Sequence, residues 1–261
     1  KLFIDLNCHV WLEKPITSDL KEATEIIEMA TKKNVKVFVD HTFLFTAALT
    51  EIKKEFDSIL PITYVNSTRA NFGIIQRDSS VIWDLAVHDL SILLYLCDRM
   101  PTSVIATATS PHPNLQPSIA TIILDFEDFM STIHVNWLSP FKIRDFIIGG
   151  IGGSIHYDDT KTEDKVRFYS QGIEKLFNYD HSNIRQFDYK YGDVRIPEIA
   201  NIEALGQAFQ AFEGFIRFDI EPPSSGRHAL KIVKILDAAS ESINAGGKSI
   251  SLQKEIKMSE E

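Results

Sequence analysis

The chain is poor in the features that mark several classes of protein. It has two cysteines, Cys8 and Cys97, and neither belongs to a C-x-x-C pair, which disfavours a zinc ribbon or a redox motif. No stretch reaches the roughly 18 uncharged apolar residues that a membrane helix needs, and no signal peptide is visible. Nothing indicates an oxidising compartment. We therefore expect a soluble cytoplasmic protein.

An excess of positive charge is also missing. The formal net charge is −9 at pH 7. Nucleic acids and anionic membranes are bound through basic surfaces, so the composition argues against both kinds of partner. What the sequence does contain is 44% hydrophobic and 24% charged residues, which is typical of a globular protein with a packed core. A local basic pocket for an anionic substrate is compatible with that balance.

The first sixty residues follow a strand–helix–strand pattern. Residues 9–13 and 35–41 (HVWLE and VKVFVDH) are predicted strands, and residues 47–56 are a second predicted helix. A unit of this length predicts two parallel strands joined by a right-handed crossover. The first helix, between the strands, has apolar residues at helical spacing, namely Leu20, Ala23, Ile27 and Ala30.

The pattern changes after Pro61. Residues 81–98 are apolar nearly all round, which is typical of a buried helix. Alternating stretches between residues 102 and 196 predict a large antiparallel sheet. Helices at about 200–217 and 225–244 close the chain.

These patterns together predict the fold class. We expect an α/β protein with a partial doubly wound (Rossmann) parallel sheet over residues 1–60. An α+β domain with a large, mostly antiparallel sheet is expected over residues 61–261. The closing helix has room to pack back on the first domain.

Two residues of the predicted buried helix suggest acid–base chemistry. Asp84 and His88 are four apart, so both side chains lie on one face of an α-helix. An acid beside a histidine fixes its tautomer and stabilises its charged form, as a general base requires. The alternative is an acidic helix start followed by a satisfied core histidine, and the spacing alone favours that alternative. The neighbouring Asp89 is expected to point elsewhere.

A lysine is placed directly after the first strand. Lys14 stands before Pro15 in the tripeptide EKP, which marks either an exposed strand end or the edge of an active site. Further polar side chains follow later strands and are either solvated or contacts for an anion or sugar, because arginine pairs well with phosphate and carboxylate. These residues are Arg69, Asn71, Lys142 and Arg144.

Two other motifs carry no predicted chemistry. GGIGGS at 149–154 follows a strand and precedes no helical pattern, so we interpret it as a turn and not as a phosphate loop. His41, His134 and His156 lack metal-ligand spacing, so we predict no metal site.

The order of these motifs resembles a known family. EKP after a strand, then TFLFTAAL, then DLAVHD on a helix and then the sheet look like the Gfo/Idh/MocA family of sugar-type oxidoreductases. The end, PPSSGRHALKIVKILDAASESINAGGKSISL, resembles the closing helix and final strand of that family. The resemblance covers nearly the whole chain. It implies an enzyme that transfers a hydride between NAD or NADP and a sugar or nucleotide-sugar hydroxyl.

The resemblance also implies roles for particular residues. In the family, the EKP lysine and the D-x-x-x-H pair meet at the nicotinamide. Carried over to this chain, His88 is the general base, Asp84 its orienting partner and Lys14 the electrostatic stabiliser. The cofactor contacts are Glu13, Lys14 and Pro15, with a cis peptide between the last two. The implied substrate contacts are Arg69, Asn71, Lys142 and Arg144.

Three stretches resemble one branch of the family. NSTRANFG, WDLAVHDLSILLYL and HVNWLSPFKIR are most similar to UDP-N-acetylglucosamine and UDP-N-acetylglucosaminuronate 3-dehydrogenases. Possible oxidation at C3 of a UDP-N-acetyl sugar follows from that likeness, with inositol or simple sugars as near competitors. Family members commonly form homo-oligomers through the open face of the large sheet, and we expect the same here.

One departure from the family pattern is large. Members begin with a strand and a G-x-G-x-x-G turn that holds the cofactor pyrophosphate, whereas this chain opens at KLFIDLNC, in what resembles the helix before the EKP strand. We therefore expect a fragment of a longer dehydrogenase, with doubtful NAD binding in the chain as given. The residue that separates NAD from NADP lies in the missing part. The alternative is a non-catalytic fragment or pseudoenzyme that acts as an oligomerisation or binding module.

Overall fold

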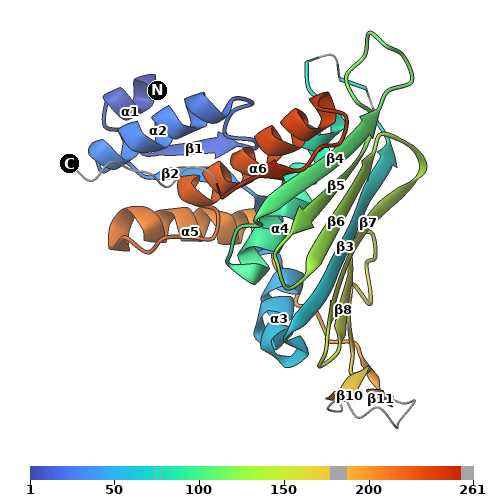
Figure 1. The fold of residues 1–261 in the computed structure, drawn as a ribbon. Coiled ribbons are helices and arrows are strands. Elements are labelled where there is room, and N and C mark those ends of the chain that lie inside the picture. Colours follow the sequence, from blue (N-terminus) through green and yellow to red (C-terminus); the bar gives the residue numbers. More distant parts are fainter. Residues whose placement is uncertain (74, 77, 177–186, 254–261) are drawn as a thin grey trace.

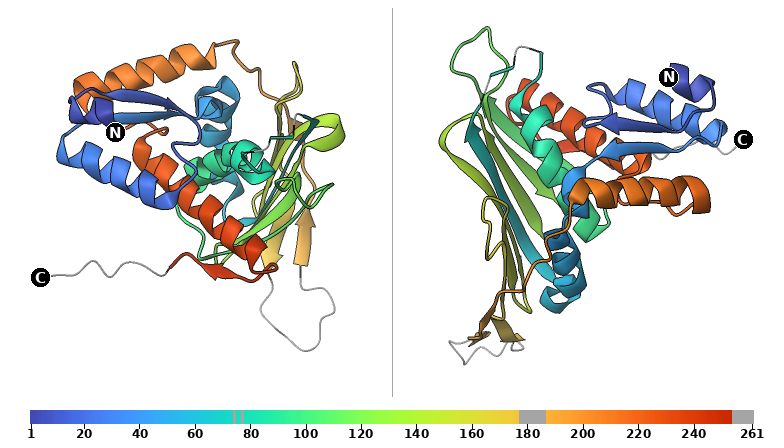
Figure 2. Two further views of the ribbon diagram at one scale, coloured as in Figure 1. Left: turned by 90° about the horizontal axis from the view of Figure 1, so that it is seen from above. Right: turned by 180° about the vertical axis from the view of Figure 1, so that it is seen from behind.

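A computed structural model describes residues 1–73, 75–76, 78–176 and 187–253. A small two-stranded sheet and a large nine-stranded sheet stand apart, with helices packed between them (Figure 1). One face of the large sheet carries the helices and the other is bare (Figure 2). This arrangement confirms the predicted fold class.

The small sheet contains the predicted strand–helix–strand unit. Strands β1 and β2 are parallel, and Glu13 at the end of β1 lies opposite Asp40 at the end of β2. Helix α2 begins because the Asp19 side chain accepts a hydrogen bond from the backbone N–H of Glu22 at 2.8 Å. It is followed by Asn34, which adopts a left-handed φ of 52°. The elements are α1 (Leu2–Asp5), β1 (Val10–Glu13), α2 (Leu20–Lys32) and β2 (Val37–Asp40).

A helical connection leads from β2 into the large sheet. Thr46 caps α3 by accepting a hydrogen bond from the backbone N–H of Leu49 at 3.3 Å. The apolar side of α3 then buries Ala48 and Ile52. The elements are the 3₁₀ turn η1 (Thr42–Phe45), α3 (Ala47–Glu55) and the 3₁₀ turn η2 (Phe56–Ile59).

The large sheet has the strand order β12-β9-β8-β7-β3-β6-β5-β4-β13. All neighbouring strands are antiparallel except β3 and β6, which run parallel. GGIGGS forms the turn between β7 and β8, as predicted, whereas the separate hairpin of β10 and β11 was not predicted. The strands are β3 (Ile62–Phe72), β4 (Ser103–Thr109), β5 (Ile119–Asp125), β6 (Met130–Asn136), β7 (Leu138–Gly150), β8 (Ser154–Asp158), β9 (Val166–Tyr169), β10 (Gly172–Leu176), β11 (Phe187–Lys190), β12 (Val194–Arg195) and β13 (Ile250–Ser251).

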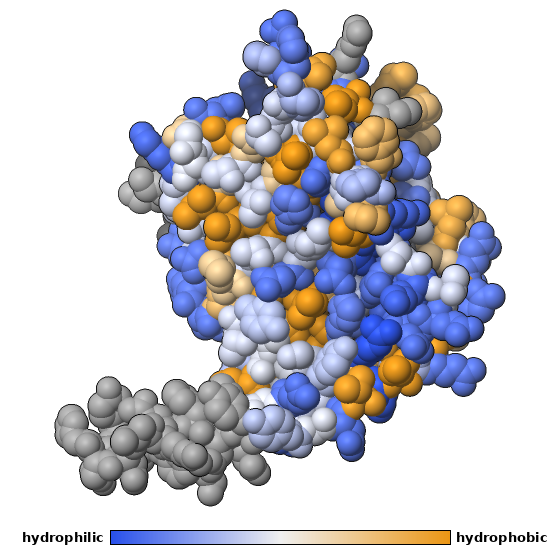
Figure 3. All heavy atoms as spheres, turned by 90° about the vertical axis from the view of Figure 1, so that its right-hand side faces the viewer, coloured by the Kyte–Doolittle hydropathy of each residue, from blue (hydrophilic) through white to orange (hydrophobic). Residues whose placement is uncertain are grey.

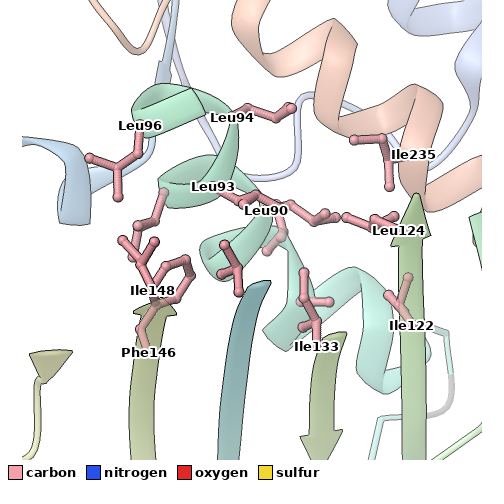
Figure 4. Packing of buried hydrophobic residues seen from close by; sticks show 14 of the residues in the cluster. Leu90, Leu93, Leu94, Leu96, Ile122, Leu124, Ile133, Phe146, Ile148 and Ile235 are labelled. Carbon is pink, nitrogen blue, oxygen red and sulfur yellow. The ribbon is translucent and has the colours of Figure 1, made fainter. Parts of the chain in front are cut away.

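The predicted buried helix lies on the covered face of this sheet. It starts as a π-helical turn, η3 (Ile82–Ala86), and continues as α4 (Val87–Cys97). The sequence predicts a uniform α-helix here, so the π turn is a difference. Leu90 and Leu93 of α4 pack with Ile133 and Ile148 of the sheet (Figure 4). Burying each such side chain contributes about 1.5–3 kcal/mol.

Two helices near the end of the chain join the two sheets. Helix α5 (Ala204–Phe218) lies against the small sheet, where the Phe212 ring contacts Trp11 and Phe38. Helix α6 (Gly226–Asn244) contacts α2 and β2 on one side and α4 and β4 on the other. The close packing of its start on β2 favours a glycine, because a Cβ on Gly226 would lie 3.0 Å from Cβ of Val37. The closing helix therefore packs back on the first sixty residues.

The bare face of the large sheet mixes polar and apolar side chains (Figure 3). Tyr64 and Met130 are exposed there. His134 faces Thr121 across a 3.1 Å hydrogen-bond distance, and His156 pairs with Asp145. Among the helices that the structure describes, none combines the length and apolar character needed to cross a bilayer.

Candidate active site

Lys14 lies at the carboxyl end of β1, and its side chain reaches the π turn of the buried helix. The Lys14–Pro15 peptide bond is cis, which confirms the prediction. Nζ of Lys14 donates to the backbone oxygen of Asp84 at 3.0 Å and lies 3.2 Å from Oδ1 of its carboxylate. The two side chains are 20% and 27% exposed, so the pair is partly shielded from solvent. The lysine is held in place, and it is not the loose strand-end side chain of the alternative interpretation.

The carboxylate of Asp84 is engaged by residues other than His88. Its Oδ2 accepts a hydrogen bond from Nε1 of the buried Trp137 at 3.1 Å, while Oδ1 faces Lys14. The hydrogen bonds of the described residues include none between Asp84 and His88. The π turn contributes to this difference, because its wider winding rotates Asp84 relative to an α-helical register. Asp84 therefore orients Lys14, and the orienting role toward His88 that its spacing suggested is not supported.

His88 is a half-buried, neutral imidazole with cations near it. Its ring meets the ring of Phe43 edge-on, with centroids 5.0 Å apart. Burial, followed by the positive charges of Arg69 and Lys14, holds the pKa of His88 well below its ordinary value. At neutral pH the ring is uncharged and has a lone pair free to accept a proton, which is what a general base needs. Lys14 contacts Asp84, which precedes His88 by four residues, so the two predicted residues lie close to each other.

Arg69 belongs to the scaffold of the site and not to its open surface. Its Nε and Nη2 donate to the two carboxylate oxygens of Asp89 at 3.0 and 2.9 Å. The two side chains are only 5% and 3% exposed, and the guanidinium lies 4.7 Å from the centroid of the Phe43 ring. The prediction of a substrate contact does not fit this buried bidentate pair. Asp89, for which the sequence suggested no role, is the partner.

Arg144 is the more accessible of the two arginines. It lies opposite Arg69 in the β3–β7 register, 5.5 Å from the same Phe43 ring. Its Nη1 donates to Asp159 at 2.7 Å, yet its side chain remains 34% exposed. Its remaining donors are available to a ligand from the solvent side.

The other two predicted substrate residues lie at the same end of β3 and β7. Lys142 is exposed and sits two residues before Arg144, so both side chains leave β7 on one face. Asn71 is half-buried near the end of β3. The structure thus gathers the polar residues of two strands near one end of the sheet.

The carboxyl ends of β1 and β2 form the edge of the small sheet at which the nicotinamide end of a dinucleotide would bind. In open parallel sheets ligands bind at this edge, and Glu13, Lys14 and Pro15 lie there. His41 follows β2 directly at the same edge, and the sequence analysis assigned it no function. The position of His41 directly after the second parallel strand is the sequence feature that could have marked it as a site residue. Within the described ranges no group of three or more histidine, cysteine or acidic residues could hold a metal ion.

Two family models match the chain, and together they cover more than half of it. One, described as an oxidoreductase family with an NAD-binding Rossmann fold, matches residues 1–41. The other, the GFO/IDH/MocA C-terminal domain, matches residues 61–156. The chain belongs to the Gfo/Idh/MocA oxidoreductase family. No protein among the curated ones matches it.

Several solved oxidoreductases share the fold of this family member. A Magnetospirillum magnetotacticum protein classed as an oxidoreductase is 27% identical with a TM-score of 0.75, over 90% of this chain and 73% of that one. UDP-N-acetylglucosamine 3-dehydrogenase from Acidithiobacillus ferrooxidans is 17% identical with a TM-score of 0.75, over 94% and 74% of the two chains. An inositol dehydrogenase homolog from Azotobacter vinelandii, complexed with NADH and myo-inositol, is 15% identical with a TM-score of 0.75, over 96% and 73%. The last two likenesses concern the fold alone.

Proposed function

We propose that the protein containing this chain is an NAD(P)-dependent dehydrogenase that oxidises a hydroxyl of a sugar or nucleotide sugar. The observation that carries the proposal is the contact of Lys14, at the carboxyl edge of a parallel sheet, with Asp84, four residues before the neutral His88. Nicotinamide, when bound there, supplies the acceptor for the hydride. The family membership agrees with this chemistry.

The two side chains divide the chemistry of the alcohol between them. His88 accepts the hydroxyl proton on a ring nitrogen, because its pKa is too low for it to be charged beforehand. Lys14 hydrogen-bonds the same oxygen and stabilises the negative charge that develops as the hydride leaves. Asp84 and Trp137 fix the lysine for that purpose. Holding these groups in place before the reaction is the main contribution of the protein.

The polar end of β3 and β7 supports a sugar or nucleotide-sugar substrate. Arg144 and Lys142 supply positive charge in a chain of net charge −9, and Asn71 supplies an amide that can pair with a hydroxyl. A phosphate or carboxylate on the substrate would be placed by Arg144. Oxidation at C3 of a UDP-N-acetyl sugar is the specific reaction that we propose within this class. The cofactor is NAD or NADP.

The bare face of the large sheet supports assembly. Its mixture of exposed apolar and hydrogen-bonded polar side chains is typical of a surface that pairs with a second copy (Figure 3). We propose a homo-oligomer formed through this face. Two free cysteines, Cys8 and Cys97, agree with a reducing, cytoplasmic setting.

The proposed function is tested with the full gene product that contains this chain. NADH or NADPH formation is followed with UDP-N-acetylglucosamine, its uronate and myo-inositol. His88→Ala should lower kcat by about 10²–10⁴-fold with little change in KM, because it removes a group needed in the transition state. Lys14→Met should also lower kcat. His112→Gln is the matched control, since His112 lies in an exposed turn.

The outcome separates the alternatives. Turnover of one sugar class by the wild type, with loss in both site variants and none in the control, supports the proposal. Full activity in His88→Ala would refute the mechanism. A folded gene product that forms no reduced cofactor with any of the three substrates would refute the substrate class.

A further inference from the structure

Three histidines with buried, unpartnered ring nitrogens lie near the candidate site. His41 follows β2, His88 lies in α4, and His228 lies in the first turn of α6. The rings of His41 and His228 are 5.9 Å apart between centroids and nearly perpendicular, at 80°. His41 is the central member, because its ring faces that of His228 and it directly precedes the turn η1, whose Phe43 ring contacts His88. We call these three residues the histidine cluster.

The histidine cluster contains an unusual concentration of unpartnered nitrogen atoms. Both ring nitrogens of His41, Nδ1 of His88 and Nε2 of His228 are buried without a hydrogen bond. Every buried side-chain nitrogen that lacks a partner in the described ranges belongs to this cluster. Buried polar atoms in folded proteins are almost always paired with protein or with ordered water. Such unpaired ring nitrogens are the atoms to which ordered water would hydrogen-bond.

The chemistry of the rings suits the passage of a proton. Burial, with smaller effects from neighbouring positive charges, lowers the pKa of His41 to about 3 and of His228 to about 4. Each ring is therefore neutral at pH 7 and has one N–H and one free lone pair. A neutral imidazole can accept a proton at one nitrogen while it releases one from the other.

Charged groups around the cluster give the proton a direction. Lys14, Arg69 and Arg144 face His88 and oppose the build-up of positive charge on it. Lys231 and Asp98 face His228, and Asp98 is exposed at the end of α4. A proton taken up at His88 is therefore repelled by the cations around that ring. At the other end of the cluster, the surface carboxylate of Asp98 attracts it.

We propose that His41 and His228, bridged by water, form a proton path that carries away the proton collected by His88. This inference rests on the proposed dehydrogenase function. The substrate O–H bond breaks and an N–H bond forms at Nε2 of His88. The N–H bond at Nδ1 breaks, and its proton moves through the bridging water to His41 and on to His228. The hydride leaves the substrate carbon with its electron pair for the nicotinamide, so the path itself involves no redox change. His41 and His228 act through His88 and are positioning residues.

The first test uses buffer dependence. His41→Phe should lower kcat by about 10–100-fold in dilute buffer while KM stays unchanged. The reason is that release of the proton from His88 then depends on encounters with buffer molecules. Raising the imidazole concentration should restore much of the rate in the variant and have no effect on the wild type. A rate that is equal to wild type, or a loss that buffer leaves unchanged, would overturn the proposal. His112→Gln again serves as the matched control, and His228→Gln carries the same test if His41→Phe does not fold.

The second test needs no turnover. In ¹⁵N-histidine-labelled, ligand-free protein the ring N–H of His88 should give a slowly exchanging signal, because it donates to bridging water held by His41. That signal should be lost in His41→Phe and kept in His112→Gln. If it persists in His41→Phe, the proton path is wrong whatever the activity. If it behaves as expected while no sugar is oxidised, the proposed function fails and the bridged cluster stands.

Discussion

The buried histidines should make the protein sensitive to mild acid. His41 and His228 have pKa values of about 3 and about 4, below the value of about 6.5 in an unfolded chain. The unfolded state therefore binds more protons than the folded state between those values. The stability that the two neutral rings confer is complete above pH 6.5 and is lost as the pH falls below it.

The size of the effect follows from the same values. One pKa unit corresponds to about 1.4 kcal/mol, so a drop from pH 7.5 to 5.0 costs about 2 kcal/mol for each of the two residues. His88, whose pKa is also lowered by burial, adds to the loss in the same direction. A total of about 4 kcal/mol is a large part of the 5–15 kcal/mol that stabilises an ordinary domain.

Urea unfolding of the full gene product at pH 7.5 and pH 5.0 measures this loss. The midpoint should fall steeply at the lower pH in the wild type. The pH dependence should shrink in the His41→Gln, His228→Gln double variant, because glutamine does not titrate. His112→Gln, in an exposed turn, should keep the wild-type dependence. Equal free energies of unfolding at both pH values in the wild type would refute the reasoning.

Three further outcomes follow from the packing. Arg69→Met should lower the free energy of unfolding by about 3–5 kcal/mol, because it leaves the Asp89 carboxylate buried without its partner; chemical denaturation measures the loss, and a change below 1 kcal/mol would contradict it. Leu93→Ala should cost about 2–5 kcal/mol, since it leaves a cavity between α4 and the sheet; a smaller loss by the same assay would argue against this packing. Trp137→Phe should lower kcat more than it raises KM, because Asp84 loses the donor that fixes it beside Lys14; unchanged kcat would show that the indole N–H is dispensable.

Local patterns in the sequence determined most of the elements. Helical spacing of apolar residues located α2, and alternation of apolar and polar residues located the main strands of the large sheet. Both could be found because side chains on one face recur about every 3.6 residues in a helix and about every 2 residues in a strand. The Ser225 side chain caps α6, where the sequence predicted that the helix begins. The EKP motif marked Lys14 as a candidate, and the family resemblance implied its cis peptide with Pro15.

Partners that are far apart in the chain were decided only by the tertiary structure. Lys14 and Asp84 are separated by 70 positions, and Trp137 lies another 53 beyond the aspartate. The helical spacing of Asp84 and His88 suggested a direct pair, but a π turn and a closer cation gave the carboxylate other partners. In the sequence, Arg69 resembles a solvated residue at a strand end. In the structure, the sheet places it under α4, where it pairs with Asp89. Spacing along one element fixes which side chains share a face, whereas sheet register and helix packing fix what that face meets. Desolvation, which makes the histidine cluster neutral, likewise arises only when distant segments enclose it.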